Sequence, residues 1–181
     1  MLKISKSWAM PSAWTFTIKP IRELVARYVC DGIGWIDPFA GENSPAEFTN
    51  DQHPDRKARW HMDAEQFCIM MRTMALSNGC LFNGVLVDPP YSYRQISEHY
   101  AEMFDKKLHP NKARSIDTTA NFYNRVMNPL CDVIKSGGYA ISFGWNTNGF
   151  GAKRGFEQVE ILIVAHGGRH NDTLVTVERK L

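Results

Sequence analysis

The sequence predicts an α/β fold, a single Rossmann-like domain with a mixed sheet of about seven strands and helices on both faces. Three observations predict it. Apolar strand-like runs alternate with segments of helical periodicity, and aspartates follow four of these runs. The chain then finishes with two strand-like segments around a Gly-Gly pair, which indicates a C-terminal antiparallel pair. The 181 residues suit one domain over positions 1–181.

The first third of the chain is expected to hold one helix and three strands. Residues 1–15 are expected to be irregular. A helix should begin near Lys19, because Pro20 suits a first turn and apolar residues recur at helical spacing at Ile21, Leu24, Val25, Tyr28 and Val29. Strands are expected at Ile33–Ile36, Phe48–Thr49 and Arg59–Met62.

The connection between the first two strands is unusually short. Ser44-Pro45-Ala46-Glu47 matches a capping box with proline at the first helical position, so it predicts about one helical turn. Parallel strands normally need a connection of about a dozen residues or more. We therefore expect a reduced first crossover.

The remaining elements follow from periodicity and from glycine punctuation. Asn78-Gly79 should close a helix over Ala64–Leu76, and Gly137-Gly138 should stop another over Thr118–Ile134. A further helical stretch is expected near Tyr93–Phe104. The loop Ala165–Asp172 suits a hairpin. The expected strands are Gly84–Val87, Tyr139–Trp145, Glu157–Val164 and Thr173–Glu178.

The net charge of the chain bears on whether it attracts nucleic acid. A formal charge of +2 gives no global electrostatic attraction to nucleic acid, although Lys106, Lys107, Lys112 and Arg114 form a local basic cluster. This cluster is either a solvated loop or a contact surface.

The cysteines and the apolar runs indicate the cellular compartment in which we expect the protein. The four cysteines have no CxxC spacing, which predicts neither zinc nor disulfides but buried free thiols in a reducing cytoplasm. The six histidines are scattered, so no metal site is expected. No run approaches membrane-spanning length, so we expect a cytosolic protein without membrane contact.

The clearest chemistry lies in Asp88-Pro89-Pro90-Tyr91, directly after the apolar run Gly84–Val87. Ligands of open α/β sheets bind outside the carboxyl ends of the strands. A carboxylate and a backbone carbonyl that accept both N–H bonds of a planar exocyclic amine localise its lone pair and stabilise charge on it. Proline has no competing N–H, and a tyrosine ring can stack on a flipped base. The alternative is a Pro-Pro turn after a strand, with a capping aspartate.

Three upstream segments predict a nucleoside-bearing ligand. Asp37-Pro38-Phe39-Ala40-Gly41 follows the first strand, where glycine allows close approach of a ligand. Asp51 ends the second strand, where an acidic side chain can bind both ribose hydroxyls. Asp63 follows the third and could accept a bond from an adenine amino group. Each aspartate alone also suits a turn or cap, so their order along the chain is the signal.

In this order the four segments, with Asp63-Ala64 as the third, resemble the motifs of adenine-specific (N6) DNA methyltransferases in their gamma arrangement. The resemblance in detail is to small phage- and prophage-type adenine methylase-like proteins, class I S-adenosylmethionine-dependent enzymes with a DPPY motif. Phe16-Thr17-Ile18-Lys19-Pro20 resembles their N-terminal cofactor motif, and Ala165–Thr173 resembles their closing segment.

The resemblance implies S-adenosylmethionine as the cofactor and assigns roles to particular residues. Asp37 and the Thr17–Ile18 backbone would face the amino-acid end of the cofactor. Asp88, Pro89, Pro90 and Tyr91 would be catalytic, with substrate contacts from Tyr91, Tyr93 and Arg94. The implied cofactor-binding residues are Phe16, Thr17, Ile18, Asp37, Pro38, Phe39, Ala40, Gly41, Asp51, Asp63, Ala64 and Asp88.

The chain departs from this family in three respects, the first being the reduced first crossover, which removes the helix whose N-terminus usually helps the cofactor site. Glu42-Asn43 stands where a further glycine is usual, and Glu42 would repel the cofactor carboxylate unless it turns outward or bonds the amino group. Sequence-reading members usually carry a recognition domain, whereas here only residues 92–118 could form a small recognition insertion.

The expected function is methyl transfer to adenine N6 in DNA, in the cytoplasm of a bacterial host cell. A homodimer or a partner subunit could supply recognition. The alternatives are a non-catalytic S-adenosylmethionine-binding subunit or sensor, and a methyltransferase that acts on RNA or on a protein amide. Asp88 favours a base over an amide, because asparagine more often opens this motif in amide-methylating enzymes.

Overall fold

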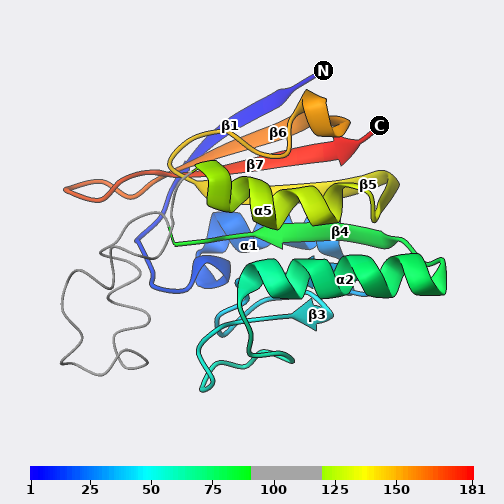
Figure 1. Cartoon of the computed structure of the whole chain (residues 1–181). Helices are drawn as coiled ribbons and strands as arrows, with labels where there is room; N and C mark the ends of the chain where they lie inside the picture. Colours follow the sequence, from blue (N-terminus) through cyan, green and yellow to red (C-terminus); the bar gives the residue numbers. More distant parts are fainter. Residues whose placement is uncertain (91–119) are drawn as a thin grey trace.

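Seven strands form one sheet in the computed structural model, which describes residues 1–90 and 120–181 (Figure 1). The strands are β1 Lys3–Trp8, β2 Trp35–Asp37, β3 Phe48–Thr49, β4 Phe82–Val87, β5 Ile134–Gly144, β6 Phe156–Ala165 and β7 Thr173–Lys180. The helices are α1 Lys19–Val29, α2 Ala64–Asn78 and α5 Ala120–Cys131, with short 3₁₀ turns η1 at Thr15–Thr17 and η2 at Ala152–Arg154.

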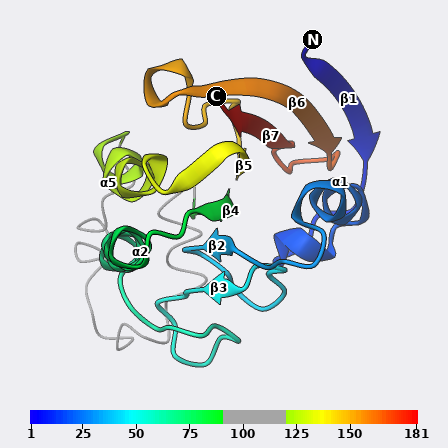
Figure 2. The same cartoon turned by 90° about the vertical axis from the view of Figure 1, so that its right-hand side faces the viewer.

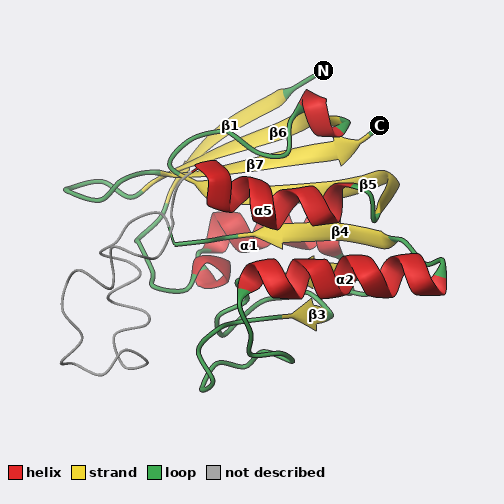
Figure 3. Ribbon diagram, in the orientation of Figure 1, coloured by secondary structure: helices red, strands yellow, loops and turns green. Residues whose placement is uncertain are grey.

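The sheet is mixed, and its strand order is β1-β6-β7-β5-β4-β2-β3. Strands β3, β2, β4 and β5 pair in parallel, whereas β7 lies antiparallel between β5 and β6 (Figure 3). The carboxyl ends of β2, β3, β4 and β5 therefore meet at one edge. The fold-class prediction is confirmed, including the antiparallel C-terminal pair.

Helices cover both faces of the sheet (Figure 2). On one face α1 buries Ile21, Leu24 and Val25 against side chains of β5, β6 and β7. On the other face α2 and α5 pack together over β4, with Phe67 and Leu130 fully buried. The expected helices near Lys19 and Ala64 are confirmed. Asp63 accepts the backbone N–H groups of residues 65 and 66, and Gly79 ends α2 in the left-handed conformation.

The expectation that residues 1–15 are irregular is wrong, because β1 pairs in parallel with β6. Its sequence, KISKSW, lacks the apolar run of a buried strand, and most of its side chains are exposed. A tertiary contact holds it in place. The buried carboxylate of Glu160 on β6 accepts bonds from Tyr28 (2.7 Å) and Arg27 (2.8 Å), and its Oε1 lies 2.9 Å from the Lys3 ammonium.

The β2–β3 connection is reduced as expected, but residues 38–47 contain no helical turn. The capping-box prediction is wrong because the Ser44 hydroxyl donates to the Asp37 carboxylate, at 2.6 Å, rather than capping a helix. The strand expected at Arg59–Met62 is also wrong. It is reduced to one isolated parallel bridge between Asn50 and Trp60.

Two expectations for the second half need correction. Helix α5 ends at Cys131, and Gly137-Gly138 lies inside β5 rather than stopping a helix. A Cβ at Gly138 would come within 2.7 Å of the Asn83 carbonyl, so glycine is needed where β5 passes close to β4. The helix expected near residues 93–104 falls outside the described residues, as does the insertion expected at 92–118.

All four cysteines are free, but only Cys68 and Cys131 are buried, so the expectation of buried thiols is wrong for Cys30 and Cys80. Within residues 1–90 and 120–181, no helix has the length and apolar character to cross a membrane. The same residues contain no group of side chains suited to hold a metal ion.

Replacing Glu160 by glutamine should lower the free energy of unfolding by about 1–3 kcal/mol at neutral pH, because three charge-assisted or hydroxyl contacts lose their anion. Burial opposes the ionised form, but the bonds from Tyr28, Lys3 and Arg27 outweigh it and hold the pKa of Glu160 below its usual value. Denaturant titration measures the loss.

The matched control is Glu157→Gln on the same strand, whose carboxylate pairs with Arg179 at 3.8 Å with both side chains about half exposed. This variant should lose less than about 0.5 kcal/mol. Equal losses in the two variants would contradict the anchoring role of Glu160.

Candidate active site

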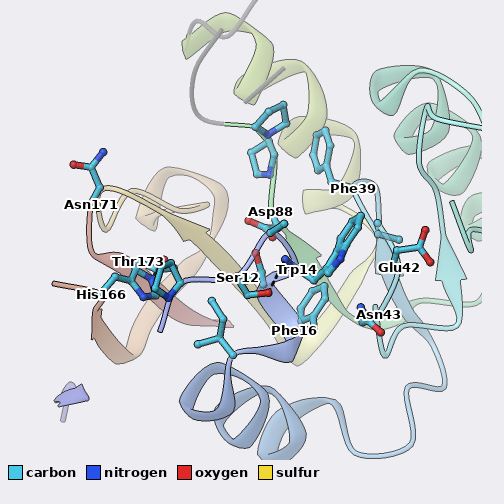
Figure 4. A pocket seen from close by; sticks show the side chains of 18 of the residues that line it. Ser12, Trp14, Phe16, Phe39, Glu42, Asn43, Asp88, His166, Asn171 and Thr173 are labelled. Atoms are coloured by element: carbon cyan, nitrogen blue, oxygen red, sulfur yellow. Dashed lines mark hydrogen bonds between the residues drawn. The ribbon is translucent and has the colours of Figure 1, made fainter. Parts of the chain in front are cut away.

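A cavity of about 900 Å³ opens at the carboxyl edge of the sheet (Figure 4). Phe39, Asp51, Asp88, Trp145 and His166, which follow β2, β3, β4, β5 and β6 respectively, all line it. Its other lining residues are Pro11, Ser12, Ala13, Trp14, Thr15, Phe16, Ile18, Ala40, Gly41, Glu42, Asn43, Arg56, Pro89, Pro90, Arg169, His170, Asn171 and Thr173.

Asp37 shapes the turn after β2 through two bonds of its carboxyl group. Its side chain has no exposed surface and does not line the cavity. Its Oδ1 accepts the Phe39 backbone N–H at 2.9 Å and its Oδ2 accepts the Ser44 hydroxyl at 2.6 Å. The turn is thus closed on itself by one carboxyl group.

Burial, helped by the charges of Asp88 and Asp51, raises the pKa of Asp37 to about 8, although the bonds from Ser44 and Phe39 lower it. Three carboxyl groups therefore interact at this edge of the sheet. Protonated Asp37 can still accept both bonds, since each oxygen keeps acceptor capacity.

The end of β3 fixes the other side of the same turn. The Asn50 side-chain amide donates to the carbonyls of Pro38 (3.1 Å) and Met62 (3.0 Å). Asp51 accepts the Gly41 N–H at 3.1 Å and the His53 N–H at 2.8 Å. Asp51 is largely buried among these donors, yet it lines the cavity.

Asp88 lies between two walls of the cavity, with Phe39, Trp14 and Glu42 on one side and His166 and Asn171 on the other (Figure 4). Burial raises the pKa of Tyr123 on α5, and the Asp88 charge raises it further, so the carboxylate lies near this ring. On the same helix Phe122 contacts Phe39 edge-to-face at 6.1 Å. Two partly buried aromatic residues of α5 therefore act on residues that line the cavity, Tyr123 through the charge of Asp88 and Phe122 through contact with Phe39.

We call Trp14, Phe16, Phe39–Glu42, Asp51 and Arg56 the cofactor wall, after the role that the sequence predicts for Phe16, Phe39–Gly41 and Asp51. The segment before α1 is fixed here by its own bonds. The Ser12 hydroxyl lies 2.8 Å from that of Thr17, which donates to the Trp14 carbonyl at 2.7 Å. A Cβ at Gly41, where φ is +55°, would lie 3.4 Å from the Trp14 ring.

We call Trp145 together with His166–Thr173 the hairpin wall. The His166 ring is clamped, because Nδ1 contacts the Ala9 carbonyl at 2.9 Å and Nε2 contacts the Thr173 hydroxyl at 2.8 Å. Since a carbonyl can only accept, Nδ1 carries the proton and Nε2 accepts from Thr173. Arg169, His170 and Asn171 at the exposed hairpin tip also line the cavity.

The structure brings most of the predicted site residues together. Nine line the cavity: Phe16, Ile18, Phe39, Ala40, Gly41, Asp51, Asp88, Pro89 and Pro90. Five others lie outside the lining: Thr17, Asp37, Pro38, Asp63 and Ala64. Asp63 caps α2, and Ala64 is buried in the core. Tyr91, Tyr93 and Arg94 fall outside the described residues, and the binding roles of all these residues stay predictions.

Sequence reasoning assigned no role to Trp14, Arg56 or Trp145. Trp145 follows β5. The expectation that ligands bind beyond the carboxyl ends of the strands, which singled out Asp88, could therefore have found Trp145 as well. Trp14 and Arg56 belong to irregular segments, and only tertiary contacts bring them to the cavity.

No protein-family model matches the chain, and a comparison with curated proteins finds no match. Among solved structures, TrmN from Thermus thermophilus is 15% identical over 90% of this chain and 49% of its own, with a TM-score of 0.46. The chain thus spans about half the length of TrmN.

Two further solved structures show similar values. The hypothetical protein TTHA0928 from Thermus thermophilus is 13% identical over 90% of this chain and 84% of its own, with a TM-score of 0.45. The N-methyltransferase NodS from Bradyrhizobium japonicum is 14% identical over 67% and 58%, with a TM-score of 0.36. At these values the similarities carry no weight for function, which has to be inferred from the site.

Replacing Asp37 by asparagine should remove a pH dependence of stability. Folding raises the pKa of Asp37 from 3.8 to about 8, so between these pH values the folded state keeps a proton that the unfolded state releases. The wild type therefore loses stability as pH rises from about 5 to about 8. The asparagine side chain does not titrate, so the stability difference, wild type minus D37N, should fall across this window.

Urea unfolding at several pH values measures this difference. Asp132→Asn, at a carboxylate that is 65% exposed, is the control and should show no such trend. A D37N difference that stays constant from about pH 5 to about pH 8 would contradict the buried, proton-binding role of Asp37.

Proposed function

We propose that the protein transfers a methyl group from S-adenosylmethionine to the N6 amine of adenine in DNA. The observation that carries the proposal is the position of Asp88-Pro89-Pro90 in the lining of a cavity of about 900 Å³, between two walls of different chemistry. A cavity of this size suits a ligand as large as a nucleoside with an amino-acid chain.

The cofactor wall fits a nucleoside. Asp51 already accepts two backbone N–H groups, and its carboxylate has further lone pairs for ribose hydroxyls. Gly41 presents backbone without a side chain to the cavity, and Phe39 and Phe16 add apolar surface. When bound, S-adenosylmethionine supplies a methyl group activated by a sulfonium centre.

Asp88 and Pro89 would act on the acceptor. The Asp88 carboxylate and the Pro89 carbonyl accept the two N–H bonds of the exocyclic amine, and this localises the lone pair that forms the new N–C bond while the S–C bond breaks. Positive charge develops on the nitrogen, and the carboxylate stabilises it and offers an acceptor for the proton that leaves. The partly buried Tyr123, whose pKa the Asp88 charge raises, and Phe122, which contacts Phe39, would limit water on this side and strengthen the interaction.

The hairpin wall supports a nucleic-acid acceptor. Trp145 offers an aromatic face, and Arg169 and His170 offer donors for phosphate oxygens at the open side of the cavity. Tyr91, Tyr93 and Arg94, with the rest of residues 92–118, are proposed as additional contacts. A homodimer or a partner subunit could extend recognition, and the bacterial cytoplasm is the proposed compartment because four free thiols persist there.

Replacing Asp88 by alanine should reduce methyl transfer to DNA by about 100-fold or more, since the group that stabilises the developing charge is lost. Affinity for S-adenosylhomocysteine should change by less than about threefold, because most of the cofactor wall is untouched. Tritiated S-adenosylmethionine with host or phage DNA measures transfer, and calorimetry measures binding.

Glu157→Gln serves as a control on an exposed strand position and should transfer at the wild-type rate. A D88A protein that labels DNA normally would end the assigned role. Wild-type binding without a labelled product would favour the non-catalytic subunit or sensor, and label on RNA or protein alone would overturn DNA as the acceptor.

A further inference from the structure

Trp14, Glu42 and Arg56 form a cluster on the cofactor wall that the chemistry above leaves without a role. The Arg56 Nη1 lies 3.6 Å from Glu42 Oε1, and the guanidinium carbon lies 5.0 Å from the centre of the Trp14 ring. The three residues come from the segment before η1, the turn after β2 and the loop after β3. All three line the cavity.

The Glu42–Arg56 pair is sheltered from solvent. The side chains are 21% and 23% exposed, whereas Lys57, whose ammonium lies 4.0 Å from Glu42, is 82% exposed. Arg56 is therefore the cation that offsets Glu42 on the cavity side. Because both charges are partly desolvated, each interacts with a ligand charge more strongly than a surface residue would.

The geometry of the pair leaves bonding capacity for a ligand. Its separation of 3.6 Å exceeds the roughly 2.7–2.9 Å of a charge-assisted hydrogen bond. A guanidinium has five N–H donors and a carboxylate has about four acceptor sites, so neither group is saturated by its partner. The Trp14 ring holds the guanidinium by a cation–π contact and is itself fixed beside Gly41.

We propose that Glu42 and Arg56 bind the zwitterionic amino-acid end of the cofactor, with Arg56 taking the α-carboxylate and Glu42 the α-ammonium. This inference rests on the proposed function. A zwitterion is the ligand whose two charges match a preformed pair, because both groups gain a partner while the net charge of the site stays unchanged. Glu42 is then no obstacle to the cofactor carboxylate, since Arg56 offsets its charge.

Three ligands that share a nucleoside separate this proposal from a purely structural role of the pair. S-adenosylhomocysteine carries both charges of the amino-acid end, decarboxylated S-adenosylmethionine keeps the amine but lacks the carboxylate, and 5′-methylthioadenosine lacks both. Calorimetry with the purified 181-residue chain gives each dissociation constant without any need for turnover.

Arg56→Gln should weaken the binding of S-adenosylhomocysteine by about tenfold or more, because it removes the partner of the ligand's α-carboxylate and leaves Glu42 uncompensated. Binding of 5′-methylthioadenosine should stay within about twofold. Glu42→Gln should weaken the binding of S-adenosylhomocysteine and of decarboxylated S-adenosylmethionine, the two ligands that carry the amine. The double variant E42Q/R56Q should lose less S-adenosylhomocysteine binding free energy than the sum of the two single losses, because each single change also leaves the other member of the pair uncompensated.

The matched controls are E157Q and R179Q, which break an exposed pair at 3.8 Å and should leave all three ligands unaffected. Should R56Q fail to fold, Arg56→Lys keeps the charge and should lose less than tenfold in S-adenosylhomocysteine affinity. Equal loss for all three ligands, or no loss for any, would overturn the proposal. A wild-type protein that binds none of the nucleosides would instead overturn the proposed function on which it rests.

Discussion

The buried carboxyl group of Asp37 is the contact on which the shape of the cavity depends. The β2–β3 connection has no helix over residues 38–47 to hold its path, so side-chain bonds must do so. Asp37 draws Phe39 and Ser44 together, and Asn50 and Asp51 bond the same turn. As a result Phe39, Gly41 and Glu42 face the cavity with fixed backbone positions. A carboxyl without exposed surface is costly, and its pKa of about 8 records that cost.

The sheet topology explains how one cavity comes to have two walls, as the two ligands of the proposed reaction require. The parallel strands β2, β3 and β4 bring the cofactor wall and Asp88 to a single edge, while the antiparallel pair β6–β7 places its connecting hairpin at the same edge. Trp145 and the hairpin thus face the cofactor wall across Asp88. In the proposed reaction, the amine acceptor and the methyl donor would therefore lie on different sides of the Asp88 carboxylate.

Patterns within short stretches of the sequence predicted the helices and strands that form from local interactions. Helical spacing and caps located α1 and α2, and apolar runs located most of the central strands. Asp51 and Asp88 could be predicted to line the cavity because parallel strands place their carboxyl ends together, and ligands bind at that edge. Contacts between distant segments were not predictable in this way. The polar β1 depends on Glu160, Ser44 bonds Asp37 instead of capping a helix, and Arg56 reaches Trp14 only through the fold.

A crystal structure of the protein with S-adenosylhomocysteine would show whether the cofactor and Asp88 share one cavity. We expect the ribose at Asp51, the amino-acid end at Glu42 and Arg56, and the sulfur directed toward Asp88 across the cavity. A nucleoside bound away from the carboxyl edge of the sheet, or a sulfur with the Asp88 carboxylate turned away from it, would show that Asp88 does not act on the transferred methyl group.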